Sequence, residues 1–189
     1  GYNFGQKYKK MGYRSSETRE LIFDDCRIPK ENILGNPDKG ISQFLMALQT
    51  SRIGFAAHSV GLAQAILDVS LTYSKEREQF GRTISKFQVT QFKLADMLME
   101  IELARLMVYK AAWQKDNGEN YFPTSTYAKI FASETAKRCA DQGVQIHGGY
   151  GLMDEYPISR YWREVKFDEI LDGTSEIQRL NIARKVLKL

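Results

Sequence analysis

The sequence has little of the chemistry that builds metal sites or disulfide frameworks. Its 189 residues include two cysteines, Cys26 and Cys139, and two histidines, His58 and His147. The cysteines lie far apart and outside any C-x-x-C spacing, and the histidines have no cysteine or carboxylate at metal-ligand spacing. Because zinc sites and disulfide frameworks depend on such spacings, we expect neither. Unpaired cysteines fit a reducing, cytoplasmic location.

Long apolar runs and blocks of one charge are also missing. The longest uncharged run, 53–67, is shorter than the roughly 20 apolar residues that a bilayer span needs. The net charge is +4, and apart from Lys7, Lys9 and Lys10 the basic residues are interleaved with acidic ones. A nucleic-acid surface concentrates its basic residues, whereas this pattern suits a few phosphates on a small ligand. We expect no membrane segment and no nucleic-acid partner.

Residues 1–35 carry short alternating runs such as "RELIF" and "CRIP", broken by Gly12, "DD" and Pro29. Such runs are typical of short antiparallel strands and turns. A few strands alone lack the partners that an independent sheet needs. We therefore interpret the chain as the C-terminal piece of a longer protein.

From about Gly40 onward the pattern is helical. Phe44, Leu48, Phe55 and Leu62 recur at intervals of four or seven residues with small residues between them, which predicts one long, closely packing helix. Further helices are predicted at 87–113, 124–146, about 157–166 and 174–187, the last with Ser175 as its N-cap. Long helices joined by short loops favour an antiparallel bundle. The predicted fold is mainly α, an up-down four-helix bundle with a short β segment at the N-terminus.

Four stretches then carry a family likeness. "KMGYRSSETRELIFDDCRIPKENILG", "YSKEREQFGRTISKFQVTQFKLADM", "VQIHGGYGLMDEYPISRYWREVKF" and "LDGTSEIQRLNIARKVL" resemble, in this order and spacing, the C-terminal half of the acyl-CoA dehydrogenase family. The elements R-x-x-F-G, Q-I-x-G-G-x-G and G-T-S-x-I-Q match together. The resemblance implies that residues 1–35 are terminal strands of a β middle domain and residues 36–189 a C-terminal four-helix-bundle domain.

The resemblance also implies a function. Members of this family are FAD enzymes that dehydrogenate an acyl-CoA thioester between its α and β carbons: a carboxylate removes the α-proton and the flavin takes the β-hydrogen as hydride. An electron-transfer flavoprotein usually receives the electrons. The family further implies a homotetramer, built as a dimer of dimers, in which two subunits complete each FAD site. The redox chemistry belongs to the cofactor, so the protein must supply binding, orientation and a base.

Asp172 matches the family's usual catalytic carboxylate, in "LDGT" where the common pattern is Y-E-G-T. Aspartate is shorter than glutamate by one methylene, about 1.5 Å, and a misplacement of about 1 Å can cost a hundredfold in rate. Leu171 replaces an aromatic ring that lines the acyl pocket in relatives, which indicates a reshaped pocket for a branched or cyclic acyl group. Some relatives carry the base immediately before the position of Arg52, where this chain has Ser51.

Local sequence offers Asp172 a second interpretation. Asp-Gly is a favoured turn dipeptide, and aspartate is a good cap ahead of a helix. The family register favours the base. In relatives the backbone N–H at this position donates to the thioester carbonyl, as oxyanion-hole donors do, and Gly173 would keep the approach clear.

The remaining candidates follow from the resemblance as well. Arg77 resembles the arginine that reaches the flavin pyrophosphate of a neighbouring subunit, and Arg52 matches an arginine near the CoA and acyl site. The other predicted FAD contacts are Phe80, Gln88, Gln145, Gly148, Gly149, Thr174 and Glu176. Taken without the family, the same residues are explained by an exposed helix-end cation, a solvated glutamine, a glycine C-cap and an N-cap.

Two classes of function remain open. The first is an FAD-dependent acyl-CoA dehydrogenase with Asp172 as base, or a relative running as an enoyl-CoA reductase. The second is a catalytically silent homologue whose bundle serves assembly or binding. A carboxylate at Asp172 favours the first class. The isolated 189-residue chain is expected to be inactive, because most of the flavin and substrate surface would lie on other domains.

Overall fold

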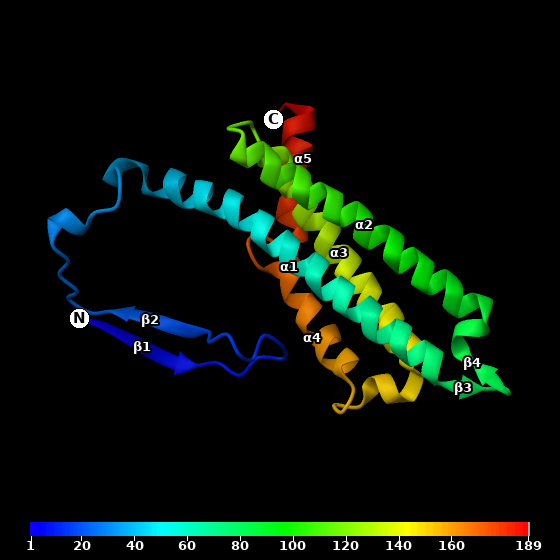
Figure 1. Ribbon diagram of the computed structural model, residues 1–189. Coiled ribbons are helices and arrows are strands. Elements are labelled where there is room, and N and C mark those ends of the chain that lie inside the picture. The colour runs from blue at the N-terminus through cyan, green and yellow to red at the C-terminus, as the bar shows by residue number, and fades with distance from the viewer. Residues whose placement is uncertain (189) are drawn as a thin grey trace.

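A computed structural model describes residues 1–188 of the chain (Figure 1). Its α-helices are α1 (Gly40–Glu76), α2 (Gln88–Asp116), α3 (Phe122–His147), α4 (Pro157–Ile170) and α5 (Ser175–Leu187). Antiparallel pairs are formed by β1 (Tyr2–Lys7) with β2 (Arg19–Phe23) and by β3 (Glu78–Gln79) with β4 (Arg82–Thr83). Short 3-10 turns are η1 (Lys30–Asn32), η2 (Pro37–Lys39), η3 (Ile84–Lys86) and η4 (Gly148–Leu152). The predicted mainly α fold with a short N-terminal β segment is confirmed.

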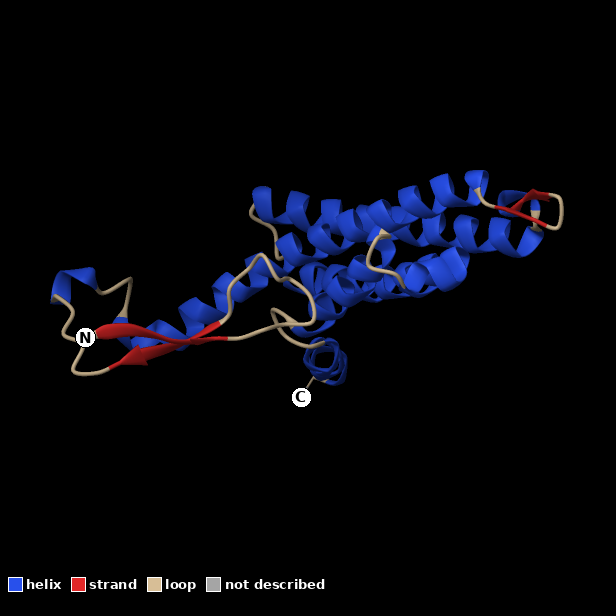
Figure 2. Cartoon of the chain, turned by 90° about the horizontal axis from the view of Figure 1, so that it is seen from below, coloured by secondary structure: helices blue, strands red, loops and turns tan. Residues whose placement is uncertain are grey.

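Helices α1 to α4 run alternately in opposite directions, as an up-down bundle requires (Figure 1). Helix α5 does not continue this alternation. In the view of Figure 2 it is seen nearly end-on, so it crosses the direction of the bundle. The turn between α4 and α5 therefore lies where the chain changes direction.

The centre of the bundle is the contact of α1 with α3, which is more extensive than any other contact between described elements. Helix α3 presents Ala128, Ala132, Ala136 and Ala140, all fully buried. A four-residue spacing places them in one row on one face of the helix. Because these side chains are single methyl groups, neighbouring helices can approach α3 closely.

One helix within the described residues is long and apolar enough to cross a membrane by length and composition alone, and it contains α1. The core helix of a bundle meets the same criteria. In this structure α1 packs against α2, α3 and α4, as the core helix of a bundle does.

The helix ends correct one prediction. Ser175 is not the N-cap of α5 but its first residue, and it is buried. Thr174 is the cap: its hydroxyl oxygen accepts a hydrogen bond from the backbone N–H of Ile177 at 3.3 Å. Helix α4 also continues to Ile170, four residues beyond the predicted end. The prediction ended too early because the last turn buries a charged residue, Asp168, where the helical pattern calls for an apolar one.

The β1–β2 hairpin stands apart from the bundle in Figure 1. Its register pairs Tyr2 with Phe23 and Phe4 with Leu21, and these side chains are exposed. The loop of residues 8–18 between the two strands reaches α4, where a Cβ on Gly12 would lie 2.8 Å from the carbonyl oxygen of Arg163. The predicted domain boundary after residue 35 stays a prediction.

Gly143 marks the tightest point of the helical core. A Cβ at this position would lie 2.6 Å from Cδ1 of Ile158 on α4 and 2.9 Å from Cγ2 of Ile66 on α1. Gly61 on α1 offers a contrast, since a Cβ there would meet no atom within 4 Å. One glycine is thus required by packing and the other is not.

We expect Gly143→Ala to lower the free energy of unfolding by about 1–3 kcal/mol, because overpacking forces neighbouring side chains to move. Gly61→Ala is the matched control and is expected to raise it by roughly 0.5–1 kcal/mol, since alanine loses less backbone entropy in a helix. Urea denaturation followed by circular dichroism measures both. Equal midpoints for the two variants would contradict the packing of α1, α3 and α4 at Gly143.

Candidate functional site

The turn between α4 and α5 holds two consecutive left-handed residues. Asp172 has a φ of 55° and Gly173 a φ of 97°. Aspartate tolerates this region better than most residues, and glycine adopts it without steric cost. Leu171 ends α4 by donating its N–H to the carbonyl oxygen of Phe167 at 2.8 Å, and Thr174 caps α5. The turn is therefore defined at both ends by helix caps.

Side chains from three helices converge on the backbone of this turn. Gln178 Nε2 of α5 donates to the carbonyl oxygens of Asp172 and Gly173, at 3.2 Å in each case. Lys129 Nζ of α3 donates to Gly173 O at 2.8 Å. Arg52 Nε of α1 lies 3.4 Å from Asp172 O. The backbone of the turn is thus held by α1, α3 and α5 together.

The carboxyl group of Asp172 has a free oxygen. Its Oδ2 atom is buried and has no hydrogen-bond partner within residues 1–188, and the same is true of Arg52 Nη1. Burial lowers the pKa of Arg52, and the charge of Asp172 opposes that shift. Buried polar atoms without partners are uncommon in native proteins. Here an acceptor and a donor are both left available, which suits a ligand that brings its own polar groups.

Lys129 was missed by the sequence analysis. Its side chain is only 1% exposed, and burial lowers the pKa of its ammonium group to about 8, although the nearby carboxylates of Asp168 and Asp172 oppose the shift. One signal was present in the sequence: Lys129 lies midway between Ser125 and Ser133, and this helical face is buried. A lysine on a core-facing row could have been singled out.

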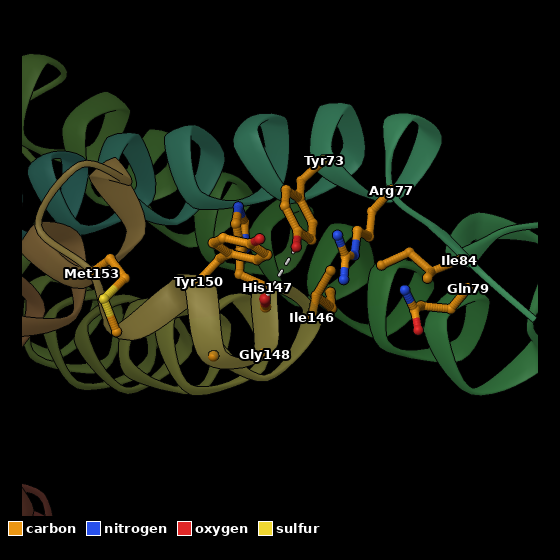
Figure 3. Close-up of a pocket in the computed structure, with 10 residues that line it drawn as sticks. Tyr73, Arg77, Gln79, Ile84, Ile146, His147, Gly148, Tyr150 and Met153 are labelled. Atoms are coloured by element: carbon orange, nitrogen blue, oxygen red, sulfur yellow. Dashed lines mark hydrogen bonds between the residues drawn. The ribbon is translucent and has the colours of Figure 1, made fainter.

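A second region lies at the other end of α1 (Figure 3). It is a cleft of about 550 Å³ lined by Tyr73, Arg77, Gln79, Ile84, Ile146, His147, Gly148, Gly149, Tyr150 and Met153. The guanidinium carbon of Arg77 lies 5.3 Å from the centre of the Tyr150 ring. Tyr73 stacks on His147 with ring centres 4.3 Å apart. Gly148 has a φ of 60° and ends α3. A cation, bare backbone and aromatic walls are thereby gathered in one cleft.

The structure brings together some of the predicted cofactor residues and separates others. Arg77, Gly148 and Gly149 share the cleft. Gln88 and Gln145 are exposed, at the start of α2 and near the end of α3. Phe80 lies at the tip of the β3–β4 turn, with a φ of 53° and 93% of its surface exposed.

Thr174 and Glu176 lie with Asp172, far from the cleft. Hydrogen bonds to backbone N–H and to the Thr174 hydroxyl hold the pKa of Glu176 below its usual range. Arg52 and Arg77 are 25 residues apart on α1, about 37 Å at 1.5 Å per residue, which exceeds the diameter of a small domain. Within one chain, the two groups of predicted site residues cannot surround the same small molecule.

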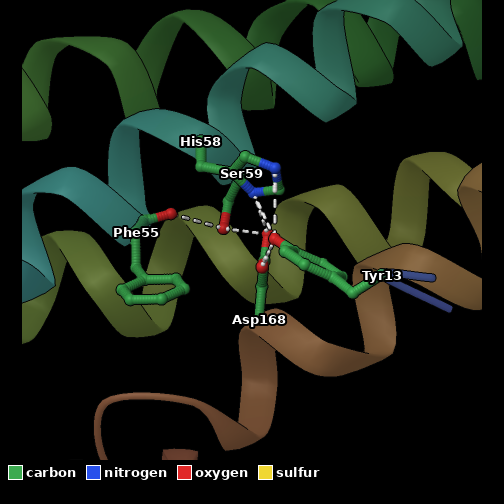
Figure 4. A network of polar contacts seen from close by, with 5 residues as sticks. All are labelled: Tyr13, Phe55, His58, Ser59 and Asp168. Carbon is green, nitrogen blue, oxygen red and sulfur yellow. Dashed lines mark hydrogen bonds and ion pairs between the residues drawn. The ribbon is translucent and has the colours of Figure 1, made fainter. Parts of the chain in front are cut away.

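A polar network joins the loop of residues 8–18 to the bundle (Figure 4). Fully buried Asp168 accepts hydrogen bonds from Tyr13 Oη at 2.7 Å and Ser59 Oγ at 2.8 Å, and its Oδ2 lies 3.1 Å from His58 Nδ1. Burial and this carboxylate raise the pKa of Tyr13 well above its ordinary value. The sequence alone does not predict this network, because its members are far apart in the chain. It anchors α4 to α1 one helical turn before Asp172.

With this geometry established, comparison with known proteins identifies the family. Residues 38–187 match the family model described as acyl-CoA dehydrogenase, C-terminal domain. The chain belongs to the acyl-CoA dehydrogenase family. The resemblance inferred from the four sequence stretches is therefore confirmed.

Members of the family resemble this chain over its whole length. It is 55% identical over 188 residues to a probable acyl-CoA dehydrogenase, YngJ, of Bacillus subtilis (strain 168), covering 100% of this chain and 50% of the relative. It is 43% identical to acryloyl-CoA reductase (NADH) of Anaerotignum propionicum, covering 100% and 48%. The solved structure of butyryl-CoA dehydrogenase from Megasphaera elsdenii superposes with a TM-score of 0.97 at 44% identity, covering 99% and 49%. The chain spans about half the length of these family members.

The two histidines are expected to titrate on opposite sides of the ordinary histidine pKa, about 6.5. A hydrogen bond to the Asp168 carboxylate raises the pKa of His58, with a smaller contribution from Glu164, whereas burial lowers the pKa of His147. A raised folded-state pKa means that the His58 contribution to stability is complete below about pH 6.5 and is lost as the pH rises through that pKa. Ring C–H shifts in NMR spectra measure both titrations.

Asp168→Asn should lower the pKa of His58 and leave that of His147 unchanged. Asp68→Asn, on the same helix as His58 but exposed and bonded to Gln64, is the matched control and should change neither. Two histidines that titrate together in the wild-type protein would contradict the network.

Proposed function

We propose that this chain is the C-terminal part of an FAD-dependent acyl-CoA dehydrogenase in which Asp172 is the catalytic base. The observation that carries the proposal is the unpaired Oδ2 of Asp172, on a left-handed turn whose backbone is held by three helices. A turn or cap residue would direct its side chain to a backbone N–H. Thr174 already performs that task for α5.

The residues present fit an FAD site. In the cleft, Arg77 offers a planar cation suited to a diphosphate, and Gly148 and Gly149 have open space where a Cβ would stand. Gln88, Gln145, Thr174 and Glu176 are the further family contacts that we assign to the cofactor. FAD would supply the acceptor for the β-hydrogen, which leaves as hydride.

The protein's own residues then act on the α-proton. Asp172 Oδ2 takes this proton: the α C–H bond breaks, an O–H bond forms on the carboxyl group, and the electron pair remains on the substrate. The backbone N–H of Asp172 would donate to the thioester carbonyl and stabilise the developing negative charge. Arg52, whose Nη1 is buried and unpaired within the described residues, adds positive charge beside the acyl group.

The exchange of glutamate for aspartate bears on substrate choice. On a fixed backbone a shorter carboxylate reaches about 1.5 Å less far, so the substrate must come closer to the turn. Leu171, which follows α4 directly, leaves more room than the aromatic ring it replaces. We infer an acyl group that is branched or cyclic near the thioester.

Two or more copies of the chain are needed to complete the site. The cleft and the Asp172 turn lie too far apart to serve one cofactor within one chain. Helix α2 also exposes Phe92, Met99, Leu106 and Trp113, and their seven-residue spacing places them in one stripe suited to packing against another helix. Together with the family, this supports a homotetramer built as a dimer of dimers.

We assign the electron acceptor and the direction of the reaction from the family. An electron-transfer flavoprotein is the partner that we assign, with acyl-CoA as the substrate. The acryloyl-CoA reductase among the relatives supports a second candidate, an enoyl-CoA reductase. A silent homologue is disfavoured by the free carboxyl oxygen of Asp172.

The free cysteines, Cys26 and Cys139, support a cytoplasmic location.

Asp172→Asn should slow flavin reduction by about a hundredfold or more, because general-base catalysis contributes on the order of 10²–10⁴ in rate. The measurement mixes the full-length FAD-bound protein, without oxygen, with butyryl-, isovaleryl- and cyclohexanecarbonyl-CoA while flavin absorbance is followed. Asp172→Glu is the matched variant: it keeps a carboxylate, so it should reduce its flavin faster than Asp172→Asn, although its longer side chain shifts the base. Wild-type bleaching that Asp172→Asn leaves unchanged would remove Asp172 from the chemistry, and no bleaching with any substrate would favour the silent homologue.

The isolated 189-residue chain is expected to bind no FAD at unit stoichiometry and to show no dehydrogenase activity. It should still associate, because the apolar stripe on α2 is part of it. The absorbance spectrum after incubation with FAD measures binding, and light scattering measures mass. A spectrum with one bound flavin per chain would contradict this expectation.

A further inference from the structure

Lys129 is a buried cation whose hydrogen bonds go to the backbone and not to a carboxylate, although the charges of Asp168 and Asp172 act on it. Its ammonium group donates to two backbone carbonyl oxygens, of Glu169 at 3.2 Å and of Gly173 at 2.8 Å, and it forms no ion pair within residues 1–188. Lysine is almost never fully buried unless it is paired, because removing an ammonium group from water is strongly unfavourable. An apolar side chain of the same length would fill this space without that cost. Packing therefore does not account for the lysine.

The two carbonyl groups lie on either side of Asp172 in the chain. Glu169 belongs to the last turn of α4, where carbonyl groups lack helical partners and the helix dipole attracts a cation. Gly173 is the second of the two left-handed residues. A single ammonium group thus joins the end of α4 to the middle of the turn and encloses Asp172 between two fixed points.

The neighbouring side chains act on the same backbone. Gln178 donates to the carbonyl oxygens of Asp172 and Gly173, and a Cβ on Gly173 would lie 2.5 Å from its Nε2. Lys129, Gln178 and Arg52 all donate to the backbone of the turn, yet none of them bonds to Asp172 Oδ2. The donors hold the backbone and leave the acceptor oxygen free.

We propose that Lys129 is a positioning residue for Asp172, whose ammonium group fixes the α4–α5 turn through the Glu169 and Gly173 carbonyls so that the carboxyl oxygen stays free and oriented. This inference rests on the proposed function, because it assigns Lys129 to the same site. The residue acts through the turn and does not touch the substrate.

Lys129→Met in the full-length FAD-bound protein tests the proposal. Methionine keeps the length and the packing but removes both hydrogen bonds. The rate constant for flavin reduction at saturating acyl-CoA should fall about ten- to a hundredfold, since a misplacement of about 1 Å costs up to that much. The dissociation constant for the acyl-CoA should change by no more than about threefold, because a positioning effect falls on the chemical step.

Lys137→Met is the matched control. Lys137 lies on the same helix and faces the same residue, but it is half exposed and reaches the Glu169 side chain, at 3.8 Å, and not its carbonyl. This variant should leave both constants unchanged. A loss of rate in Lys137→Met equal to that in Lys129→Met would assign the effect to general weakening of the α3–α4 contact and overturn the proposal.

Amide hydrogen exchange gives a readout that does not depend on activity. The segment 169–178 should exchange faster in Lys129→Met than in wild type or Lys137→Met, because its backbone loses a fixed point. Unchanged exchange, or faster exchange with an unchanged rate of flavin reduction, would overturn the proposal. Should Lys129→Met fail to assemble, Gln178→Leu removes the other donor to the Gly173 carbonyl, and the same criteria apply to it.

The two proposals can fail separately. If Asp172→Asn reduces its flavin at the wild-type rate, the proposed base is wrong, and with it the positioning role of Lys129. If Asp172→Asn is inactive and Lys129→Met is as fast as wild type, the base stands and the role of Lys129 is refuted.

Discussion

The close approach of α1 to α3 is the constraint on which the rest of the structure depends. Four buried alanines in a row on α3 keep this helix narrow where it is packed. The approach carries Arg52 on one helix and Lys129 on the other to the same turn of backbone. The polar site therefore depends on how these two helices pack.

Helix α4 shows how buried charge is used in this bundle. Its last turn is held from one side by Asp168, which binds Tyr13, Ser59 and His58, and from the other side through the Glu169 carbonyl, which binds Lys129. Neither arrangement is an ion pair between two fully buried groups. Each satisfies a charge with hydroxyl groups, a partly exposed ring or backbone dipoles, which avoids placing two desolvated charges against one another. The result is a helix end with little freedom, directly before the turn that carries Asp172.

The sequence predicted the helices because their burial follows a regular period, and it predicted Asp172 because a family motif places it. It did not predict the Asp168 network or Lys129. Both are polar groups at core positions, where a pattern of apolar residues predicts nothing. Their partners are side chains from distant segments or backbone carbonyl groups, which a local sequence pattern does not reveal. The N-cap of α5 was misplaced by one residue because Thr174 and Ser175 are both good caps, and only the backbone angles choose between them. The separation of the two groups of site residues could likewise be seen only once α1 was known to be one continuous helix, with Arg52 near one group and Arg77 near the other.

The turn at Phe80 has a consequence for how this protein could change. A large aromatic residue holds the first position of a two-residue hairpin turn, in the left-handed region that asparagine or glycine would occupy more easily. Its ring is almost wholly in water. Asparagine at this position would make a better turn and expose less apolar surface, so the aromatic ring is a cost to the single chain. A search for thermostable variants would therefore find this residue early.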